Sequence, residues 1–173
     1  MMKFLTFAST GSFIIIVAYL NIVQTGYNPL YQLMSELALG EQGELMLGAF
    51  LSFAIALISA SFYLTARLLK ILMSVAALAL IAAGVFKLGA NTELHVALVA
   101  IAFVLIVLTM YLTPRLNTCS KIQRLIHWSL GLITALFVAL GQSLLPIGLA
   151  QRLATISIFL WLAWLVSIHR KTL

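Results

Sequence analysis

Six apolar segments, each about as long as a membrane span, dominate this chain of 173 residues. A transmembrane helix needs about 20 predominantly apolar residues. Between polar breaks the sequence offers six such segments, which we expect to be helices over residues 4–23, 44–66, 69–90, 95–113, 125–145 and 152–168. Charged residues make up only 8% of the chain, against about 25% in a typical soluble domain. The sequence therefore predicts an all-α fold, an integral membrane bundle of six transmembrane helices forming one domain over residues 1–173.

The positive charges are distributed unevenly between the two ends of these helices. Lys and Arg are enriched in short cytoplasmic loops of membrane proteins. With a cytoplasmic N-terminus, only Lys87 and Arg152 lie on the outer side, and all four acids lie there too. The remaining cations are then cytoplasmic: Lys3, Arg67, Lys70, Arg115, Lys121, Arg124, Arg170 and Lys171. We therefore expect a multi-pass protein of the cell (cytoplasmic) membrane with both termini in the cytoplasm.

The net charge and the metal-binding residue types exclude several functions. The formal net charge is +6, but the cations stand singly or in pairs, without the basic stripe of a nucleic-acid-binding surface. The single cysteine, Cys119, excludes an internal disulfide and a thiolate-rich metal site. His95 is expected on the outer side, whereas His127 and His169 are expected on the inner side, where axial haem ligation is a weak alternative. We expect no metal, no cofactor and no nucleic-acid partner.

The longest connection, residues 24–43, carries its own helix signals. Asn28 is a favourable N-cap, Pro29 suits the first helical position, and Gly40 suits the left-handed C-terminal position. These signals predict a short amphipathic helix over about residues 29–39, lying in the outer interface or folded as a lid over the bundle. In such a helix the polar face would carry Gln32, Ser35 and Glu36.

A stripe of small residues follows the fifth apolar segment. Gly131, Ala135, Ala139 and Ser143 recur at four-residue spacing. Such spacing lets a neighbouring helix approach closely. We expect this stripe to pack within the chain, with a homodimer face as the alternative.

Polar residues at the outer ends of the helices are the candidate ligand-binding residues. No ionisable residue falls in the middle third of any expected span, which argues against a proton pump or a carboxylate relay. Each outer charge has a structural explanation, such as snorkelling to headgroups or complementing a helix dipole. Two cations near several acids and a histidine nevertheless favour a site for a lipid or another amphiphilic anion. The candidates are Ser35, Glu36, Lys87, His95 and Arg152.

Three stretches of the sequence resemble the domain-of-unknown-function 998 family. They are Ser35-Glu36-Leu37-Ala38-Leu39-Gly40 after Tyr27-Asn28-Pro29-Leu30, then Gly84-Val85-Phe86 leading to His95, and Gly148-Leu149-Ala150-Gln151-Arg152. The resemblance implies a small multi-spanning prokaryotic membrane protein without an assigned activity. It places Ser35, Glu36, His95 and Arg152 at recurrent polar positions of the family. The chain departs from the family pattern after Phe86, where Lys87-Leu88-Gly89 stands in place of a proline and an acid.

These observations leave three functions open. In the first, an outward-facing polar pocket at headgroup level binds a membrane lipid or amphiphilic ligand, with Arg152 and Lys87 on its anionic group. In the second, the same pocket belongs to a lipid hydrolase or transferase with His95 as general base toward Ser35 or a trapped water. A Ser-His-acid arrangement with Ser35 as nucleophile would need Glu93 as the orienting acid. In the third, the chain is an accessory or assembly subunit that docks a membrane-protein partner.

Overall fold

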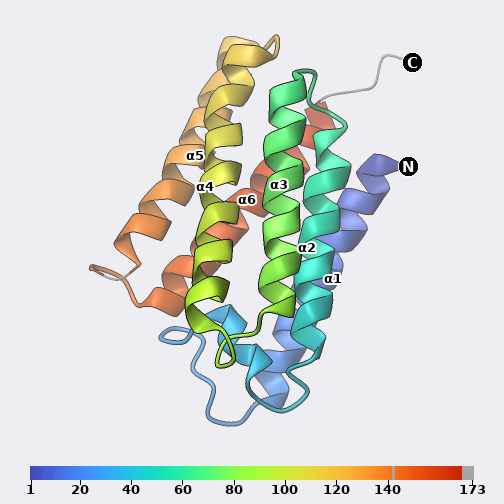
Figure 1. Ribbon diagram of the computed structural model, residues 1–173. Helices are drawn as coiled ribbons and strands as arrows, with labels where there is room; N and C mark the ends of the chain where they lie inside the picture. Colours follow the sequence, from blue (N-terminus) through green and yellow to red (C-terminus); the bar gives the residue numbers. More distant parts are fainter. Residues whose placement is uncertain (142, 169–173) are drawn as a thin grey trace.

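The computed structural model describes residues 1–141 and 143–168, which contain six α-helices, one short 3-10 helix and no strand (Figure 1). The helices are α1 (Met2–Val23), η1 (Met34–Ala38), α2 (Leu45–Ser61), α3 (Arg67–Val85), α4 (Thr92–Leu116), α5 (Lys121–Leu140) and α6 (Ile147–Ile168). The predicted all-α class is confirmed.

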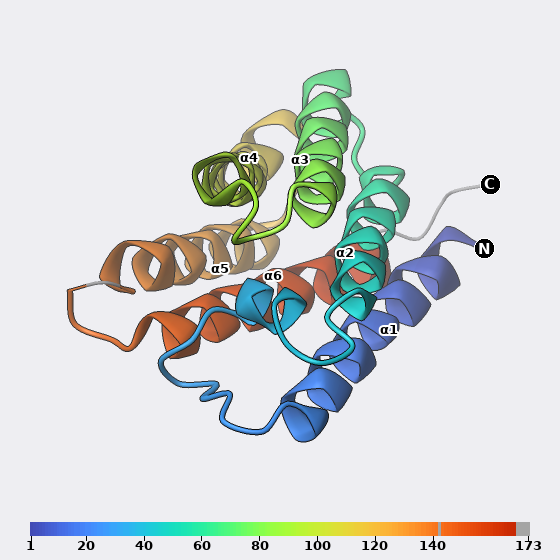
Figure 2. The same cartoon turned by 60° about the horizontal axis from the view of Figure 1, so that its bottom comes forward.

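Each helix packs against the next one along the chain, and α6 returns to contact both α1 and α2. Viewed along the bundle, α6 lies between α5 on one side and α1 and α2 on the other (Figure 2). The start of α1 and the end of α6 lie at one end of the bundle, called here the terminal end (Figure 1). The opposite end, called the η1 end, carries η1 and the α3–α4 and α5–α6 connections.

Aromatic side chains from three helices join the bundle at its centre. The rings of Phe13, Phe53 and Phe159 meet edge to face, with centroids 4.9 to 5.4 Å apart. Nearer the terminal end, the buried Trp161 donates a hydrogen bond from Nε1 to Nδ1 of the buried His127, at 2.7 Å. His127, expected only to lie near the inner end of its helix, is thus buried against α6. Because α6 supplies both Phe159 and Trp161, it is the central element of the bundle.

In the described part of the chain, five helices are long and apolar enough to cross a membrane, namely α1, α3, α4, α5 and α6. The helix α2 has 17 residues, about 26 Å at 1.5 Å per residue, and is shorter than the span expected over residues 44–66. Its C-terminal side is held by Asn117, whose Oδ1 accepts hydrogen bonds from Thr65 N and Ala66 N. The multi-pass character is supported, but the count of six spans is not confirmed.

The segment expected to be an amphipathic α-helix over residues 29–39 forms only the 3-10 helix η1. Asn28 caps a turn instead, with its Oδ1 accepting from Leu30 N at 3.0 Å. Gly40 is not among the glycines with positive φ, so its predicted left-handed role is wrong. Ser35 is 3% exposed, not on a solvated polar face, because η1 packs against α1, α2 and α6. These tertiary contacts replace the α-helical periodicity that the sequence indicates.

Two helix boundaries at the η1 end also differ from expectation. The helix α3 ends at Val85, so Lys87 lies in the connection beyond it, exposed, rather than a turn inside the helix. The helix α6 begins at Ile147, so Gln151 and Arg152 lie in its second turn rather than at its start. Lys87 therefore lies in an exposed connection, whereas Arg152 lies within a helix and is partly buried.

Topology can be tested at Cys119, which lies in the α4–α5 connection at the terminal end. Burial raises the pKa of its thiol, while Arg124 lowers it, so labelling should be done at alkaline pH. We expect a membrane-impermeant maleimide to label Cys119 only after the cells are permeabilised, because the terminal end carries most of the cations. Lys87→Cys in a Cys119→Ser background should be labelled in intact cells. The reverse pattern would contradict this orientation.

Candidate functional site

Arg152 of α6 binds the connection between α1 and η1. Its Nη1 donates to the backbone oxygens of Pro29, at 2.6 Å, and Gln32, at 3.2 Å. Its Nη2 donates to the hydroxyl of Tyr27 at 2.6 Å. These bonds help to satisfy backbone carbonyls of the loop, and they fix the loop against α6. We call this set of contacts the loop clamp.

Two further hydrogen bonds complete the loop clamp at the first turns of α6. Leu149 N donates to Leu30 O at 2.9 Å, and Gln151 Oε1 accepts from Met34 N at 2.7 Å. Gly148 lies so close to the loop that a Cβ there would clash with three of its carbonyl oxygens. The stretch from Gly148 to Arg152 is therefore the surface on which the η1 segment is seated.

Tyr27 is the neutral partner of Arg152 in the loop clamp. Burial raises the pKa of its phenol, although the hydrogen bond and charge of Arg152 oppose the shift. The protonated hydroxyl accepts from Arg152 and donates to Leu33 O at 2.9 Å. Tyr27 thereby links the guanidinium to the residue that precedes η1.

Glu36 is used within its own segment. Its two carboxylate oxygens accept from Leu33 N, at 2.8 Å, and from Gln32 Nε2, at 3.1 Å. Glu36 also lines a polar hollow of about 350 Å³ together with Gln24 and Glu41. Its carboxylate therefore caps η1 rather than neutralising a cation.

His95, in the first turn of α4, is buried, with 2% of its surface exposed. Its Nδ1 lies 2.8 Å from Ala83 O and 3.0 Å from Phe86 O. Because a carbonyl oxygen can only accept, Nδ1 must carry the proton. The other ring nitrogen, Nε2, is buried and has no hydrogen-bond partner in the described part of the chain. His95 thus holds the end of α3 with one nitrogen and offers an unused acceptor with the other.

A cavity of about 370 Å³ lies beside His95, between η1, α4, α5 and α6. Apolar side chains form most of its wall, including Val96, Val99, Ala100, Phe103, Phe137, Val138 and Ile147. Val96, Ala100 and Val138 are exposed, so the cavity opens between α4 and α5 on a face that would contact lipid. A neutral or amphiphilic ligand could therefore enter from the side.

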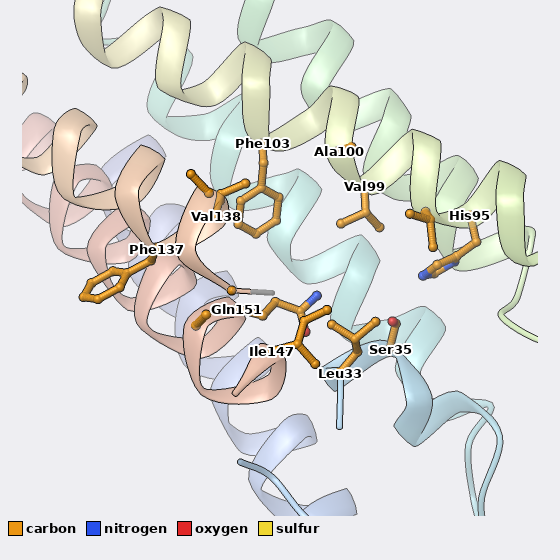
Figure 3. A pocket seen from close by; sticks show the side chains of 14 residues that line it. Leu33, Ser35, His95, Val99, Ala100, Phe103, Phe137, Val138, Ile147 and Gln151 are labelled. Carbon is orange, nitrogen blue, oxygen red and sulfur yellow. The ribbon is translucent and has the colours of Figure 1, made fainter. Parts of the chain in front are cut away.

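Three polar side chains project into this cavity: Ser35, His95 and Gln151 (Figure 3). Ser35 makes no side-chain hydrogen bond with any other described residue, and it is buried. The Oε1 of Gln151 is occupied by Met34 N, which leaves its Nε2 as a donor. An acceptor, a donor and a hydroxyl that can do both therefore meet among apolar walls.

The structure brings two of the five predicted site residues, Ser35 and His95, into one cavity. Glu36, Lys87 and Arg152 do not line it. Glu36 and Arg152 hold the η1 segment, and Lys87 is exposed outside it. Gln151 was not among the five, although it stands beside Arg152 in the same stretch.

The geometry expected of a hydrolase is incomplete. Glu93 is exposed, and the atom that an orienting acid would bind, His95 Nδ1, is bound to carbonyl oxygens instead. No group of three or more His, Cys, Asp or Glu side chains able to hold a metal occurs among the described residues. The cavity therefore offers hydrogen-bonding groups, but it lacks the carboxylate that would orient His95 to activate a nucleophile.

Comparison with known proteins assigns a family but no activity. No curated protein and no solved structure matches the chain. A family model described as protein of unknown function (DUF998) matches residues 7–168, which is nearly the whole chain. Residues of the three stretches that resemble this family form part of the loop clamp or of the surroundings of the cavity. The chain therefore belongs to the DUF998 family.

Proposed function

We propose that this protein binds a membrane lipid or a similar amphiphile in the cavity beside His95. The observation that carries the proposal is the buried, unpartnered Nε2 of His95 in an apolar cavity that opens toward lipid. A buried acceptor without a partner costs free energy, about 1–3 kcal/mol. A ligand that donates a hydrogen bond to Nε2 would offset this cost.

The polar groups of the cavity define the head of the ligand. His95 Nε2 needs a hydrogen-bond donor on the ligand and Gln151 Nε2 needs an acceptor, whereas the Ser35 hydroxyl can pair with either. A head that carries both a hydroxyl and a phosphate or carboxylate oxygen meets these requirements. The apolar walls suit a hydrocarbon chain, which would leave the cavity between α4 and α5. An amphiphilic anion with a hydroxylated head is therefore the ligand class that fits best.

In this proposal the predicted charged residues position the site. Arg152 and Glu36 hold the segment that carries Ser35, and Lys87 makes no contact with the ligand. With the η1 end on the outer side of the cytoplasmic membrane, the head of the ligand lies at the level of the outer headgroups. Binding by Ser35, His95 and Gln151 then replaces the direct contact to Arg152 that the sequence suggested.

Two other functions are weaker on the same geometry. A lipid hydrolase or transferase would use His95 Nε2 as general base toward the Ser35 hydroxyl, but His95 lacks the orienting carboxylate that such a pair commonly uses. An accessory or assembly subunit would need a docking partner, and this role stays a prediction. Binding requires only groups that already line the cavity.

Ser35→Ala tests the proposal without breaking a hydrogen bond within the described protein. We expect the affinity for lysophosphatidylglycerol, whose head carries hydroxyls and a phosphate, to fall about 2- to 10-fold. Binding can be measured by titration of delipidated protein in mild detergent. Ser74→Ala is the matched control, because Ser74 is exposed on α3 away from the cavity. Equal affinities in the two variants would count against the proposal.

A further inference from the structure

A second hollow lies between α4 and α5, nearer the terminal end. This groove, about 760 Å³ in volume, is lined almost entirely by apolar side chains. Val104, Leu108 and Leu132 on its rim are exposed, so it opens to the lipid-facing surface. Gly131 brings α5 close to α4, since a Cβ there would lie 3.3 Å from Met110 Cβ. The groove has room for a hydrocarbon chain beyond this point of contact.

Aromatic rings and two arginines form the terminal end of the groove. Tyr111 and Trp128 line it, and Trp128 Nε1 donates to Tyr111 O at 3.2 Å. The guanidinium carbon of Arg115 lies 3.9 Å from the Tyr111 ring centroid and 5.3 Å from that of Trp128. The guanidinium carbon of Arg124 lies 5.9 Å from the Trp128 centroid. Both cations therefore flank one indole ring at the mouth of an apolar groove.

Within the described residues, no Asp or Glu lies at the end of the bundle that carries these two arginines. All four acids of the chain lie at the η1 end: Glu36 in η1, Glu41 and Glu44 in the α1–α2 connection, and Glu93 in the first turn of α4. The guanidinium of Arg115 uses only part of its donors, on Tyr111 O and Tyr111 Oη. The positive charge of Arg115 and Arg124 is therefore available to bind an anion from outside the chain.

We propose that this groove binds an anionic phospholipid, with its phosphate between Arg115 and Arg124 and one acyl chain along α4 and α5. Guanidinium groups match phosphate oxygens in charge and in hydrogen-bond geometry. Trp128 and Tyr111 suit the boundary between headgroup and hydrocarbon. The complementary charge above an apolar groove identifies a lipid as the occupant. The groove adjoins the cavity beside His95, because Phe103, Val138 and Ala139 line both, but its two arginines lie toward the opposite end of the bundle.

The test compares two lipids with identical chains, phosphatidylglycerol and phosphatidylcholine, titrated into delipidated protein in mild detergent. We expect the wild-type protein to prefer phosphatidylglycerol. Arg115→Gln combined with Arg124→Gln should lower the affinity for phosphatidylglycerol roughly tenfold or more, and lower that for phosphatidylcholine less, because its choline cation already offsets the charge of the phosphate. Arg67→Gln is the matched control, because Arg67 is exposed at the start of α3 and is not part of this cluster.

A second variant tests the place of the acyl chain. Ala135→Phe fills the groove without changing its charge, and should weaken both lipids. Ala100 lines only the cavity beside His95, so Ala100→Phe should remove binding there and leave the effect of the double arginine variant intact, which separates the two sites. The proposal is overturned if the wild type binds both lipids equally, if Arg67→Gln acts as strongly as the double variant, or if Ala135→Phe has no effect.

Discussion

Gly148→Ala is expected to lower the free energy of unfolding by about 1–3 kcal/mol, the usual cost of forcing an extra group into a packed site. A Cβ at Gly148 would lie 2.7 Å from Pro29 O and 2.9 Å from Leu30 O, and would clash with Gln32 O as well. These atoms belong to the loop backbone, so no side-chain rotation can relieve the contact. The loop clamp must open, and thermal unfolding in detergent should show a lower midpoint.

The control for this prediction is Gly11→Ala, within α1. Apart from the backbone of α1 itself and the two adjacent residues, no atom lies within 4 Å of a Cβ at Gly11, and alanine is the better helix former by about 1 kcal/mol. This variant should therefore keep or raise the midpoint. The loop clamp would lose its role as the seat of the η1 segment if the two alanine variants unfolded at the same temperature.

Ala100→Phe is expected to abolish most ligand binding in the cavity beside His95. Ala100 lines the cavity and is exposed, so a larger side chain fits without disturbing the core. A ligand excluded from about 60 Å² of apolar wall loses about 1.5 kcal/mol, which is about tenfold in affinity. Native mass spectrometry of the purified protein measures the bound fraction directly.

Ala8→Phe is the matched control for this change. Ala8 is exposed on α1 and lines none of the described hollows. Both variants place a phenyl ring on a lipid-facing helix surface, so any general effect on folding or detergent binding is shared. Equal loss of ligand from both variants would contradict binding in the cavity beside His95.

The helices themselves could be predicted because apolar runs of about 20 residues have few alternatives to a membrane helix. Their ends were harder to place. The start of α5 is marked in the local sequence, since Ser120 and Gln123 form a capping box. The α2–α3 connection carries no such mark, because its Thr65 N and Ala66 N donate to Asn117, 52 and 51 residues further along the chain.

The η1 segment shows where local pattern fails. Its residues fit an amphipathic helix, and that periodicity placed Ser35 on the polar face. The observed segment is instead held by Arg152, Gln151 and the backbone of Leu149. Such contacts decide the conformation, but they join residues more than a hundred positions apart and leave no trace in a local pattern.

For the candidate site, the sequence predicted only the depth in the membrane at which its residues lie. Helix order fixes which residues lie near the outer surface, but not which side of a helix they occupy. Ser35 and His95 therefore proved to share a cavity, whereas Lys87, at a similar level, does not line it. The unused Nε2 of His95 was beyond prediction, because it follows from the two carbonyl oxygens at the end of α3 that bind Nδ1.

Native mass spectrometry of the protein, purified in mild detergent without added lipid, tests the central claim most directly. The wild-type protein and Ala8→Phe should retain a discrete bound mass that corresponds to an amphiphile with a hydroxylated head. Ala100→Phe should lose that mass. No retained mass in any of the three proteins, or the same mass in all three, would contradict the proposal that the cavity beside His95 is a binding site.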